Sequence, residues 1–568
     1  MNRTQTSRYE WKWTQIDWKS VEKSVFKLQK RIYRASQAGN QVLVRKLQRL
    51  LKSSQGAKAL AVRKVTQLNQ GKHTAGVDGK KATTPKAREE LAKGVHWRNK
   101  TALIRRVWID KPGKREKRPL GIPTIMERVR QTIITFVLEP EWEARFEPNS
   151  YGFRPGRSCH DAIAAIFQSI KFKQAYVLDA DIKGCFDNIN HQALLNKLNN
   201  SHWIKRLIKV WLKAGIIDKG VVEENDSGTP QGSSLSPLLA NIALHGMEND
   251  TKQYLKEDLR RYNKHRWGVY GKYLSTISIV RYADDFLVLH ESEDIVLKAK
   301  AFLTQWLKEM GLELKAEKTR LVHTLNNYKE NKPGFNFLGF TIRQFKCADR
   351  AKGYKLIIRP AKEKVKSHCL KIKQVVGKHR SVDQQTLIRM LNPLIRGWCN
   401  YYQYVVSRLT FEKVRQTLFW QTWSWACYRH SYRHRKWIKR KYFITDEGNN
   451  WRFRLKEGIK LLEHTDWKIT RFVKVKGNKS PYDGDFVYWA TRMGKYREGL
   501  QKAAVILKRQ KGKCNQCGLY FRSEDYYELE HLDGNKKNFQ WVNLSLVHER
   551  CSKEVCMTST TSLRSRMS

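Results

Sequence analysis

Asp284 and Asp285 interrupt an otherwise apolar run, ISIVRYADDFLVL, which spans residues 277–289. The residues on both sides of the two acids are mostly β-branched or aromatic, and such residues favour β-strands. The run therefore predicts two short strands joined by a tight turn that carries the acids. Carboxylates held at a rigid turn can bind a divalent metal ion. A solvated hairpin tip is the ordinary alternative for an isolated Asp-Asp pair, so the rest of the chain decides between them.

The composition of the chain points to a polyanionic partner. Its 568 residues include 110 Lys and Arg against 53 Asp and Glu, which gives a formal net charge of +57. This length predicts three or more domains, and an apolar share of 40% is enough for folded cores. So large a positive charge on folded domains favours nucleic acid. A membrane surface is a weaker alternative, because no basic amphipathic helix stands out.

Targeting signals and disulfides are not expected. No apolar run reaches the roughly 18 residues of a transmembrane helix, and the N-terminal segment lacks the apolar centre of a signal peptide. Ten cysteines are scattered along the chain, and only the last four cluster. This distribution favours a reducing compartment and one metal site over a disulfide framework. We therefore expect a cytoplasmic protein with no membrane partner.

A second acidic segment has the sequence YVLDADIKGCFD at residues 176–187. It predicts a strand that ends in acids and is followed by a turn. Asp181 would then join Asp284 and Asp285 as three carboxylates on β-elements. Two Mg²⁺ ions held in this way could activate a 3′-hydroxyl and stabilise a leaving pyrophosphate. Mg²⁺ needs few protein carboxylates, because water and substrate phosphates complete its coordination.

With these two acidic segments, the chain resembles the reverse transcriptase/maturase proteins encoded by bacterial group II introns, especially those of cyanobacterial type. Seven motifs follow one another in the order of that family: RPLGIPT (118–124), NSYGFRPG (149–156), Asp181–Asp187, GTPQGSSLSP (228–237), Tyr282–Asp285, GLEL (311–314) with Lys318, and FLGF (337–340). The resemblance implies a multidomain α+β protein. Its parts would be a right-hand polymerase with fingers and palm, a helical thumb and maturase domain, and a small zinc-stapled ββα-type C-terminal domain.

The resemblance also implies roles for individual residues. Asp181 and Asp284 would be ligands of two Mg²⁺ ions, with Asp285 adjacent. Phe186 would lie under the sugar of the incoming nucleotide and select dNTPs over rNTPs, because a bulky ring clashes with a 2′-hydroxyl. A packed Phe at a strand end is the structural alternative for Phe186. The nucleotide pocket would also include Arg118, Gln231, Gly232 and Lys318.

The part of the chain after the polymerase motifs is rich in bases and aromatic residues. Its segment LIRGWCNYY (394–402) matches the maturase signature of the family. Basic side chains give salt-dependent affinity for phosphates, and exposed rings can stack on bases. Helix packing is the alternative for any single aromatic residue. We predict RNA contacts from Arg396, Trp398, Tyr401, Arg429, Arg433, Lys436 and Arg440.

A Cys/His cluster near the C-terminus predicts a structural Zn²⁺ site. Cys514 and Cys517 form one pair of ligands, and His548 and Cys551 form another, a spacing that suits tetrahedral Zn²⁺. The segment between the pairs resembles an HNH endonuclease, in which His531 would be the general base, Glu530 a ligand of a further divalent metal and Asn543 the loop-positioning residue.

This HNH-like segment departs from the family pattern. Asp is usual at the position of Glu530, and Ser552 stands where a second metal-binding His is expected. The loop after the base is also shortened to residues 532–537. Loss of a ligand from so sparse a site would weaken cleavage. An active nuclease and a zinc-bound DNA-binding remnant both stay open.

The motif order predicts the domain organisation. The expected parts are an N-terminal helical RNA-binding extension (1–80), reverse transcriptase fingers and palm (81–345), a thumb and maturase domain (346–443), a DNA-binding segment (444–504), an HNH-like zinc domain (505–556) and a disordered tail (557–568).

These features predict an RNA-directed DNA polymerase and intron maturase of the bacterial cytoplasm. It would bind its group II intron RNA, assist splicing and support intron mobility by target-primed reverse transcription, with dNTPs and target DNA as further partners. One alternative is an RNA-folding splicing factor that does not need the polymerase. The other is a reverse transcriptase of a different retroelement. Whether the protein forms a dimer stays open.

Overall fold

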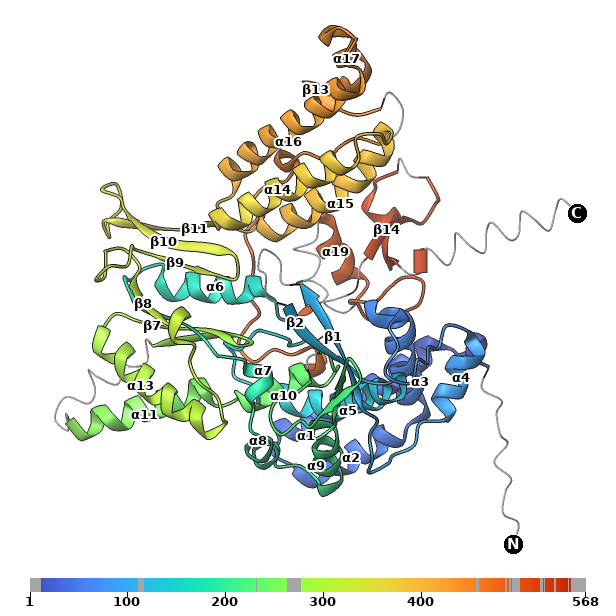
Figure 1. Ribbon diagram of the computed structural model, residues 1–568, viewed down its shortest axis with the longest axis vertical. Coiled ribbons are helices and arrows are strands. Elements are labelled where there is room, and N and C mark those ends of the chain that lie inside the picture. Colours follow the sequence, from blue (N-terminus) through green and yellow to red (C-terminus); the bar gives the residue numbers. More distant parts are fainter. Residues whose placement is uncertain are drawn as a thin grey trace, which may run out of the picture.

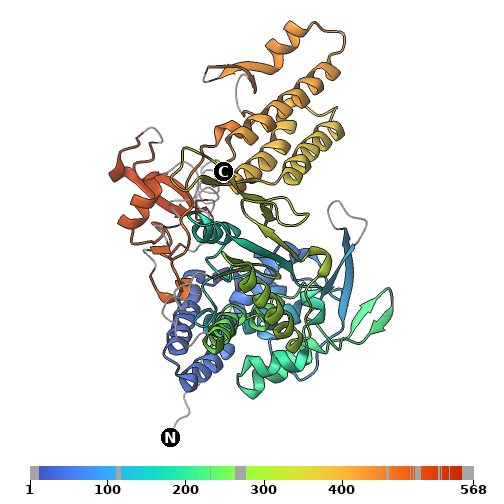
Figure 2. The same ribbon diagram turned by 90° about the vertical axis from the view of Figure 1, so that its left-hand side faces the viewer.

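The computed structural model shows a mixed α/β body with a helical lobe projecting from it (Figures 1 and 2). The predicted disordered tail (557–568) and Gln231 lie outside the residues that the structure describes. These residues are 12–110, 117–230, 232–262, 277–446, 448–455, 459–485, 488–489, 492, 501–521, 525, 527–535, 538–549 and 551–552.

The central sheet is antiparallel and contains both predicted acidic segments. Its strand order is β6 (Ser278–Tyr282), β7 (Asp285–His290), β3 (Tyr176–Asp181) and β8 (Arg320–His323). The prediction of two strands with a tight turn in the run 277–289 is thus confirmed.

Both faces of this sheet are buried, which explains why the run 277–289 is continuously apolar rather than alternating. Phe286 and Val288 of β7 pack into one core with helix α13 (Glu293–Glu309). Leu287 and Leu289 point the other way, into a second core that includes helix α6 (Cys159–Ile170). The sheet therefore lies between helices.

The first core extends into the N-terminal helices, drawn in blue in Figure 1. Helix α5 (Ile125–Glu143) is buried along almost its whole length and packs against three of these helices, α1, α2 and α3. Side chains at the N-caps of several helices accept backbone N–H bonds, as Asp17, Asn40, Ser54 and Thr124 do, and so fix where these helices begin. The helices are α1 (Trp18–Gln37), α2 (Gln41–Ser53), α3 (Gln55–Arg63), α4 (Pro85–Lys93) and α5 (Ile125–Glu143).

A second four-stranded sheet lies beside the first core. Its order is β2 (Lys117–Ile122), β1 (Ile104–Asp110), β4 (Ile216–Asp218) and β5 (Val221–Glu223), with β1 and β4 parallel. The helices that complete this body are α7 (Cys185–Asn188), α8 (His191–Leu198), α9 (His202–Leu212), α10 (Ser236–Ala243) and α11 (Met247–Tyr262).

The second core continues from the central sheet into the helical lobe at the top of Figure 1. A three-stranded sheet, β9 (Phe335–Phe337), β10 (Phe340–Lys346) and β11 (Tyr354–Pro360), connects the two. The lobe consists of α14 (Lys362–Lys378), α15 (Gln384–Tyr402), α16 (Arg408–Arg429), α17 (Arg435–Tyr442) and the hairpin β12 (Phe443–Asp446) and β13 (Asn449–Phe453).

The chain then returns from the lobe to the main body. Tyr482 packs between Phe26 and Tyr33 of α1, and the Arg492 guanidinium donates to both carboxylate oxygens of buried Asp161. The C-terminal module has its own small core and contains α19 (Gln501–Arg509), β14 (Tyr527–His531) and β15 (Leu544–His548). Within the described residues, no helix has the length and apolar character needed to cross a bilayer.

Candidate active site

The three predicted carboxylates meet at one end of the central sheet. Asp181 is the last residue of β3 and lies directly opposite Asp285, the first residue of β7. Residues directly opposite in an antiparallel pair point to the same face. Asp284 lies in the two-residue turn that joins β6 and β7, and Ala283 before it has φ +59°, as tight hairpin turns require. The Ile182 N–H donates to the Asp284 carbonyl over 3.3 Å, which places the turn beside the end of β3.

The electrostatics of this end of the sheet suit a cation. Burial, and then the neighbouring carboxylates of Asp284 and Asp181, raise the pKa of Asp285 to about 7. Burial also raises the pKa of Asp284. The Lys318 ammonium donates to the Asp181 carboxylate, and this hydrogen bond raises the pKa of Lys318. Acids that destabilise one another when ionised are stabilised by a divalent ion, so the donor set fits Mg²⁺.

Arg281 holds the turn in place, a role that the sequence did not reveal. Its buried guanidinium donates to Asn241 Oδ1 (3.0 Å), Ser150 Oγ (2.7 Å) and the Ala283 carbonyl (3.3 Å). Gly152 completes the support, because a Cβ there would lie 2.4 Å from the Ala283 nitrogen. An Arg inside an apolar run is the signal that could have indicated this network, since a buried charge needs partners.

Two of the predicted nucleotide-binding residues, Arg118 and Lys318, lie close enough to the carboxylates to act on Asp284. A Cβ on Gly232, whose φ is +114°, would lie 2.7 Å from the Gly121 carbonyl of β2, so the loop and this strand are in close contact. Arg118 on the same strand is exposed and is among the cations that oppose the rise in the pKa of Asp284. Phe186 on α7 is half-buried. Gln231 lies outside the described residues, so its role stays a prediction.

The predicted RNA-contact residues divide into two groups. Arg396, Arg433, Lys436 and Arg440 are exposed. Trp398 instead stacks on His368 with ring centroids 4.5 Å apart, and the Tyr401 hydroxyl donates to the Leu338 carbonyl over 2.8 Å. Arg429 donates to the Val382 carbonyl over 2.6 Å. Trp398 and Tyr401 thus take part in intramolecular packing, the alternative given for aromatic residues, and Arg429 is engaged by a backbone carbonyl. The RNA contacts of all three stay predictions.

The four predicted zinc ligands come together. The ligand atoms of Cys514, Cys517, His548 and Cys551 all lie within 4.8 Å of one another. Ligands about 2.0–2.3 Å from a tetrahedral Zn²⁺ lie roughly 3.5 Å apart, so the cluster needs only a small contraction. His548 Nδ1 lies 3.3 Å from Cys517 Sγ, and its Nε2 lies 3.4 Å from Asp525 Oδ2. A carboxylate behind a ligating histidine is typical of zinc sites.

The HNH-like residues lie on the hairpin β14–β15. Asn543 accepts from the Asp533 N–H (2.9 Å) and donates to the Asn538 carbonyl (2.9 Å), which agrees with a loop-positioning role. Both carboxylate oxygens of Glu530 accept hydrogen bonds, from Gln516 Nε2 (2.8 Å) and Ser545 Oγ (2.9 Å). His531 is half-buried. Two neutral donors therefore already bind the carboxylate that the nuclease metal would need.

Family models match three consecutive parts of the chain. They are the N-terminal domain of reverse transcriptase (residues 13–95), reverse transcriptase (RNA-dependent DNA polymerase; residues 109–342) and the group II intron maturase-specific domain (residues 365–443).

Proteins of known sequence give the same assignment. Group II intron-encoded protein LtrA of Lactococcus lactis is 31% identical over 53% of this chain, which spans 60% of the length of LtrA. Protein YkfC of Escherichia coli K12 is 31% identical over 48% of this chain and 77% of its own length. Maturase-like protein 1 of Euglena gracilis is 28% identical over 68% of this chain and 76% of its own length. The mixed α/β body is thus a reverse transcriptase-like fold, and the chain belongs to the reverse transcriptase/maturase family encoded by group II introns.

Proposed function

We propose that the protein is an RNA-directed DNA polymerase whose active site is the carboxylate end of the central sheet. The observation that carries this proposal is the register of Asp181 opposite Asp285, with Asp284 in the adjoining turn. When bound, two Mg²⁺ ions held by Asp181 and Asp284, with Asp285 adjacent, would activate the primer 3′-hydroxyl and stabilise the leaving pyrophosphate.

Side chains around the carboxylates supply the other requirements of the reaction. The Lys318 ammonium donates a hydrogen bond to the Asp181 carboxylate. When a metal ion takes the place of this ammonium, Lys318 would move toward the triphosphate. Arg118 supplies a second cation for the phosphates. Gly232 allows the loop backbone to approach the nucleotide closely, and Gln231 would line the same pocket. Phe186 would exclude a 2′-hydroxyl from the sugar position.

The parts of a right-hand polymerase can be assigned to the observed elements. We assign the palm to the central sheet, the fingers to the sheet β2-β1-β4-β5 with its neighbouring helices, and the thumb and maturase domain to the helices α14 to α17. The matches to reverse transcriptase and maturase models support this order. The domain limits at residues 80, 345, 443, 504 and 556 stay predictions.

The helical lobe would bind the intron RNA and assist its splicing. Arg433, Lys436 and Arg440 are exposed at and before α17, and Arg396 is exposed on α15. The formal charge of +57 supports an RNA partner, because basic side chains release counterions from phosphates. In this proposal the bound RNA is also the template that enters target DNA, with dNTPs as substrates.

The C-terminal module would be a zinc-stapled DNA-binding domain. Its four clustered ligands support one Zn²⁺. Ser552 and the two hydrogen bonds to Glu530 favour loss of the nuclease metal. A nicking assay tests this point: parent protein and His531→Ala should leave a target duplex equally uncut. Cleavage by the parent that His531→Ala abolishes would instead identify an active HNH nuclease.

Primer extension tests the polymerase. Purified protein should extend a DNA primer on an RNA template with Mg²⁺ and dNTPs, and Asp284→Ala should abolish extension. Asp258→Ala is the matched control, because the Asp258 carboxylate on α11 forms a salt bridge with Lys298 and is not one of the three predicted carboxylates. Splicing of the cognate intron by Asp284→Ala should continue. A parent protein that splices but never extends a primer would support the RNA-folding alternative instead.

A further inference from the structure

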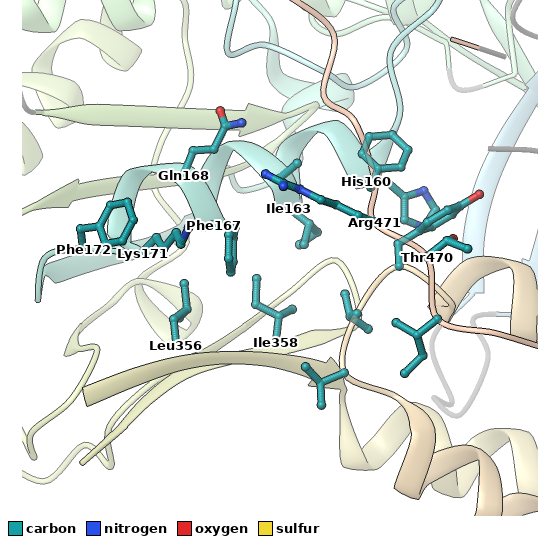
Figure 3. A pocket seen from close by; sticks show the side chains of 16 residues that line it. His160, Ile163, Phe167, Gln168, Lys171, Phe172, Leu356, Ile358, Thr470 and Arg471 are labelled. Carbon is teal, nitrogen blue, oxygen red and sulfur yellow. The ribbon is translucent and has the colours of Figure 1, made fainter. Parts of the chain in front are cut away.

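A cavity lies beside helix α6, and none of the residues proposed for the polymerase reaction line it. It has a volume of about 630 Å³ and is lined by α6, by β11, by residues 404–406 after α15 and by residues 469–472. Figure 3 shows Ile163 and Phe167 pointing from α6 toward Leu356 and Ile358 on β11. The cavity thus has two apolar walls that come from distant parts of the chain.

The mouth of the cavity exposes apolar surface that folding has not buried. Phe172 is 62% exposed, Val406 58% and Ile469 46%. Apolar side chains gathered around a hollow indicate a binding site, whereas single exposed ones do not. A ligand with an apolar, flat part would fit between the walls.

The charges around the cavity are of one sign. None of its 16 lining residues, all within the described chain, is an Asp or Glu, whereas Lys171 and Arg471 are basic and exposed. Figure 3 shows Arg471 extending from the 469–472 segment toward Gln168 on α6. The Lys171 ammonium lies 4.4 Å from the centroid of the Phe172 ring, and that of Lys352 lies 5.1 Å from the same ring. The rim is therefore suited to a phosphate group.

We propose that this cavity binds one unpaired nucleotide of a single-stranded RNA. Its base would enter between Phe167 and Ile358, and its phosphate would lie among Lys171, Lys352 and Arg471. An apolar slot with a cationic rim matches a nucleotide, which combines a flat base with an anionic phosphate. A duplex keeps its bases stacked inside and cannot fill the slot. An apolar peptide would offer no anionic group to these three cations.

This proposal rests on the proposed function in one respect only, which is that the protein binds RNA. The site is separate from the carboxylates, and it joins α6 of the body to β11, to the 404–406 connection between α15 and α16 of the lobe, and to the segment 469–472 that follows the lobe. RNA bound there would therefore hold these parts together.

Photo-cross-linking to the full-length protein tests the site. The probe is a single-stranded oligouridine of about ten nucleotides with one 4-thiouridine, within the range of single-strand site sizes. We expect a cross-link that maps to Phe167 or Phe172. A duplex of the same length should give no cross-link there. A cross-link that maps only elsewhere would overturn the proposal.

Two variants measure the contributions of the rim and the ring. Phe167→Ala should weaken binding of the oligouridine by about fivefold or more, which is the lower end of the range for one stacked base. Lys171→Gln with Arg471→Gln should reduce the dependence of log K on log salt by about 1.4, for two lost phosphate contacts. The Lys171 and Arg471 variant alters two exposed side chains and should keep the Tm of the parent, so it tests the site even where Phe167→Ala lowers the Tm.

Matched controls are Leu409→Ala, whose side chain is 81% exposed, and Lys329→Gln, whose ammonium lies 5.4 Å from the Tyr328 ring. Neither should change the cross-link. Cavity variants that behave like these controls would overturn the proposal. If the parent protein did not bind intron RNA at all, the proposed function itself would be contradicted.

Discussion

Phe153 and Phe186 meet edge to face, with ring centroids 6.0 Å apart and ring planes at 81°. Phe153 holds this position with a φ of +57° and remains 54% exposed. A left-handed backbone costs a bulky residue of the order of 1 kcal/mol and persists only where its surroundings demand it. Gly152 before it is wedged against the Ala283 backbone. Phe153 is thus placed to fix the orientation of the ring that would exclude a 2′-hydroxyl.

Phe153→Ala should weaken discrimination between dNTPs and rNTPs. An aromatic pair contributes about 0.5–1.5 kcal/mol, so the ratio of the two kcat/KM values should fall by about threefold to tenfold. Single-nucleotide extension with dTTP and with UTP measures this ratio. Trp420→Ala is the control, because Trp420 is also exposed (57%) and packs edge to face on Phe419. An equal loss of rate with both nucleotides would contradict a positioning role.

Arg281→Met should destabilise the protein and abolish DNA synthesis. Burial lowers the pKa of Arg281 to about 10, so it is still charged at neutral pH. The variant removes hydrogen bonds from a charged group to Asn241, Ser150 and Ala283, at a cost of about 3 kcal/mol or more. Thermal unfolding and primer extension measure the two effects. Arg320→Met, which breaks an exposed pair with Asp179, should cost under about 1 kcal/mol. If both variants lowered the free energy of unfolding by the same amount, burial of Arg281 would not matter for stability.

The sequence predicted the strands and the turn around Asp284 because short runs rich in β-branched and aromatic residues favour strands over helices. It could not predict that Asp181 and Asp285 are register partners, since pairing between distant strands depends on tertiary packing. Asp525 was missed because its role arises only from its distance to His548. Trp398 and Tyr401 were expected at an RNA surface, yet local composition cannot distinguish a ring that packs on His368 or Phe340 from one that faces solvent.

Asp285 should make the metal-free protein less stable as the pH rises. Its folded pKa is about 7, whereas an unfolded Asp has a pKa of about 3.9. Between these values the folded state binds more protons, so ionisation of Asp285 lowers the free energy of unfolding as the pH rises from about 4 to about 7. Asp285→Asn cannot ionise. In EDTA at about pH 8 it should melt a few degrees above the parent, and the difference should shrink toward about pH 5.

The controls for this titration are a second acid and the metal. Asp258→Asn should show no gain in Tm that grows with pH, because the Asp258 carboxylate is paired with the Lys298 ammonium and not with other carboxylates. Mg²⁺ should raise the Tm of the parent more than that of Asp285→Asn. If the Tm of Asp285→Asn exceeded that of the parent by the same amount at every pH, its effect would come from packing and not from charge.

Asp525→Asn should weaken zinc binding without removing a ligand. His548 directs Nδ1 toward Cys517 and Nε2 toward Asp525, so the carboxylate orients the imidazole and increases its basicity. Loss of such a partner typically costs about 10–100-fold in metal affinity. Competition with a chelating dye measures the affinity, and Asp533→Asn is the matched control, because Asp533 in the same module bonds to Asn543 and not to a predicted ligand. Cys517→Ser should lose the metal altogether. If Asp525→Asn held zinc as tightly as Asp533→Asn, the histidine would need no support, and the four ligands alone would account for the site.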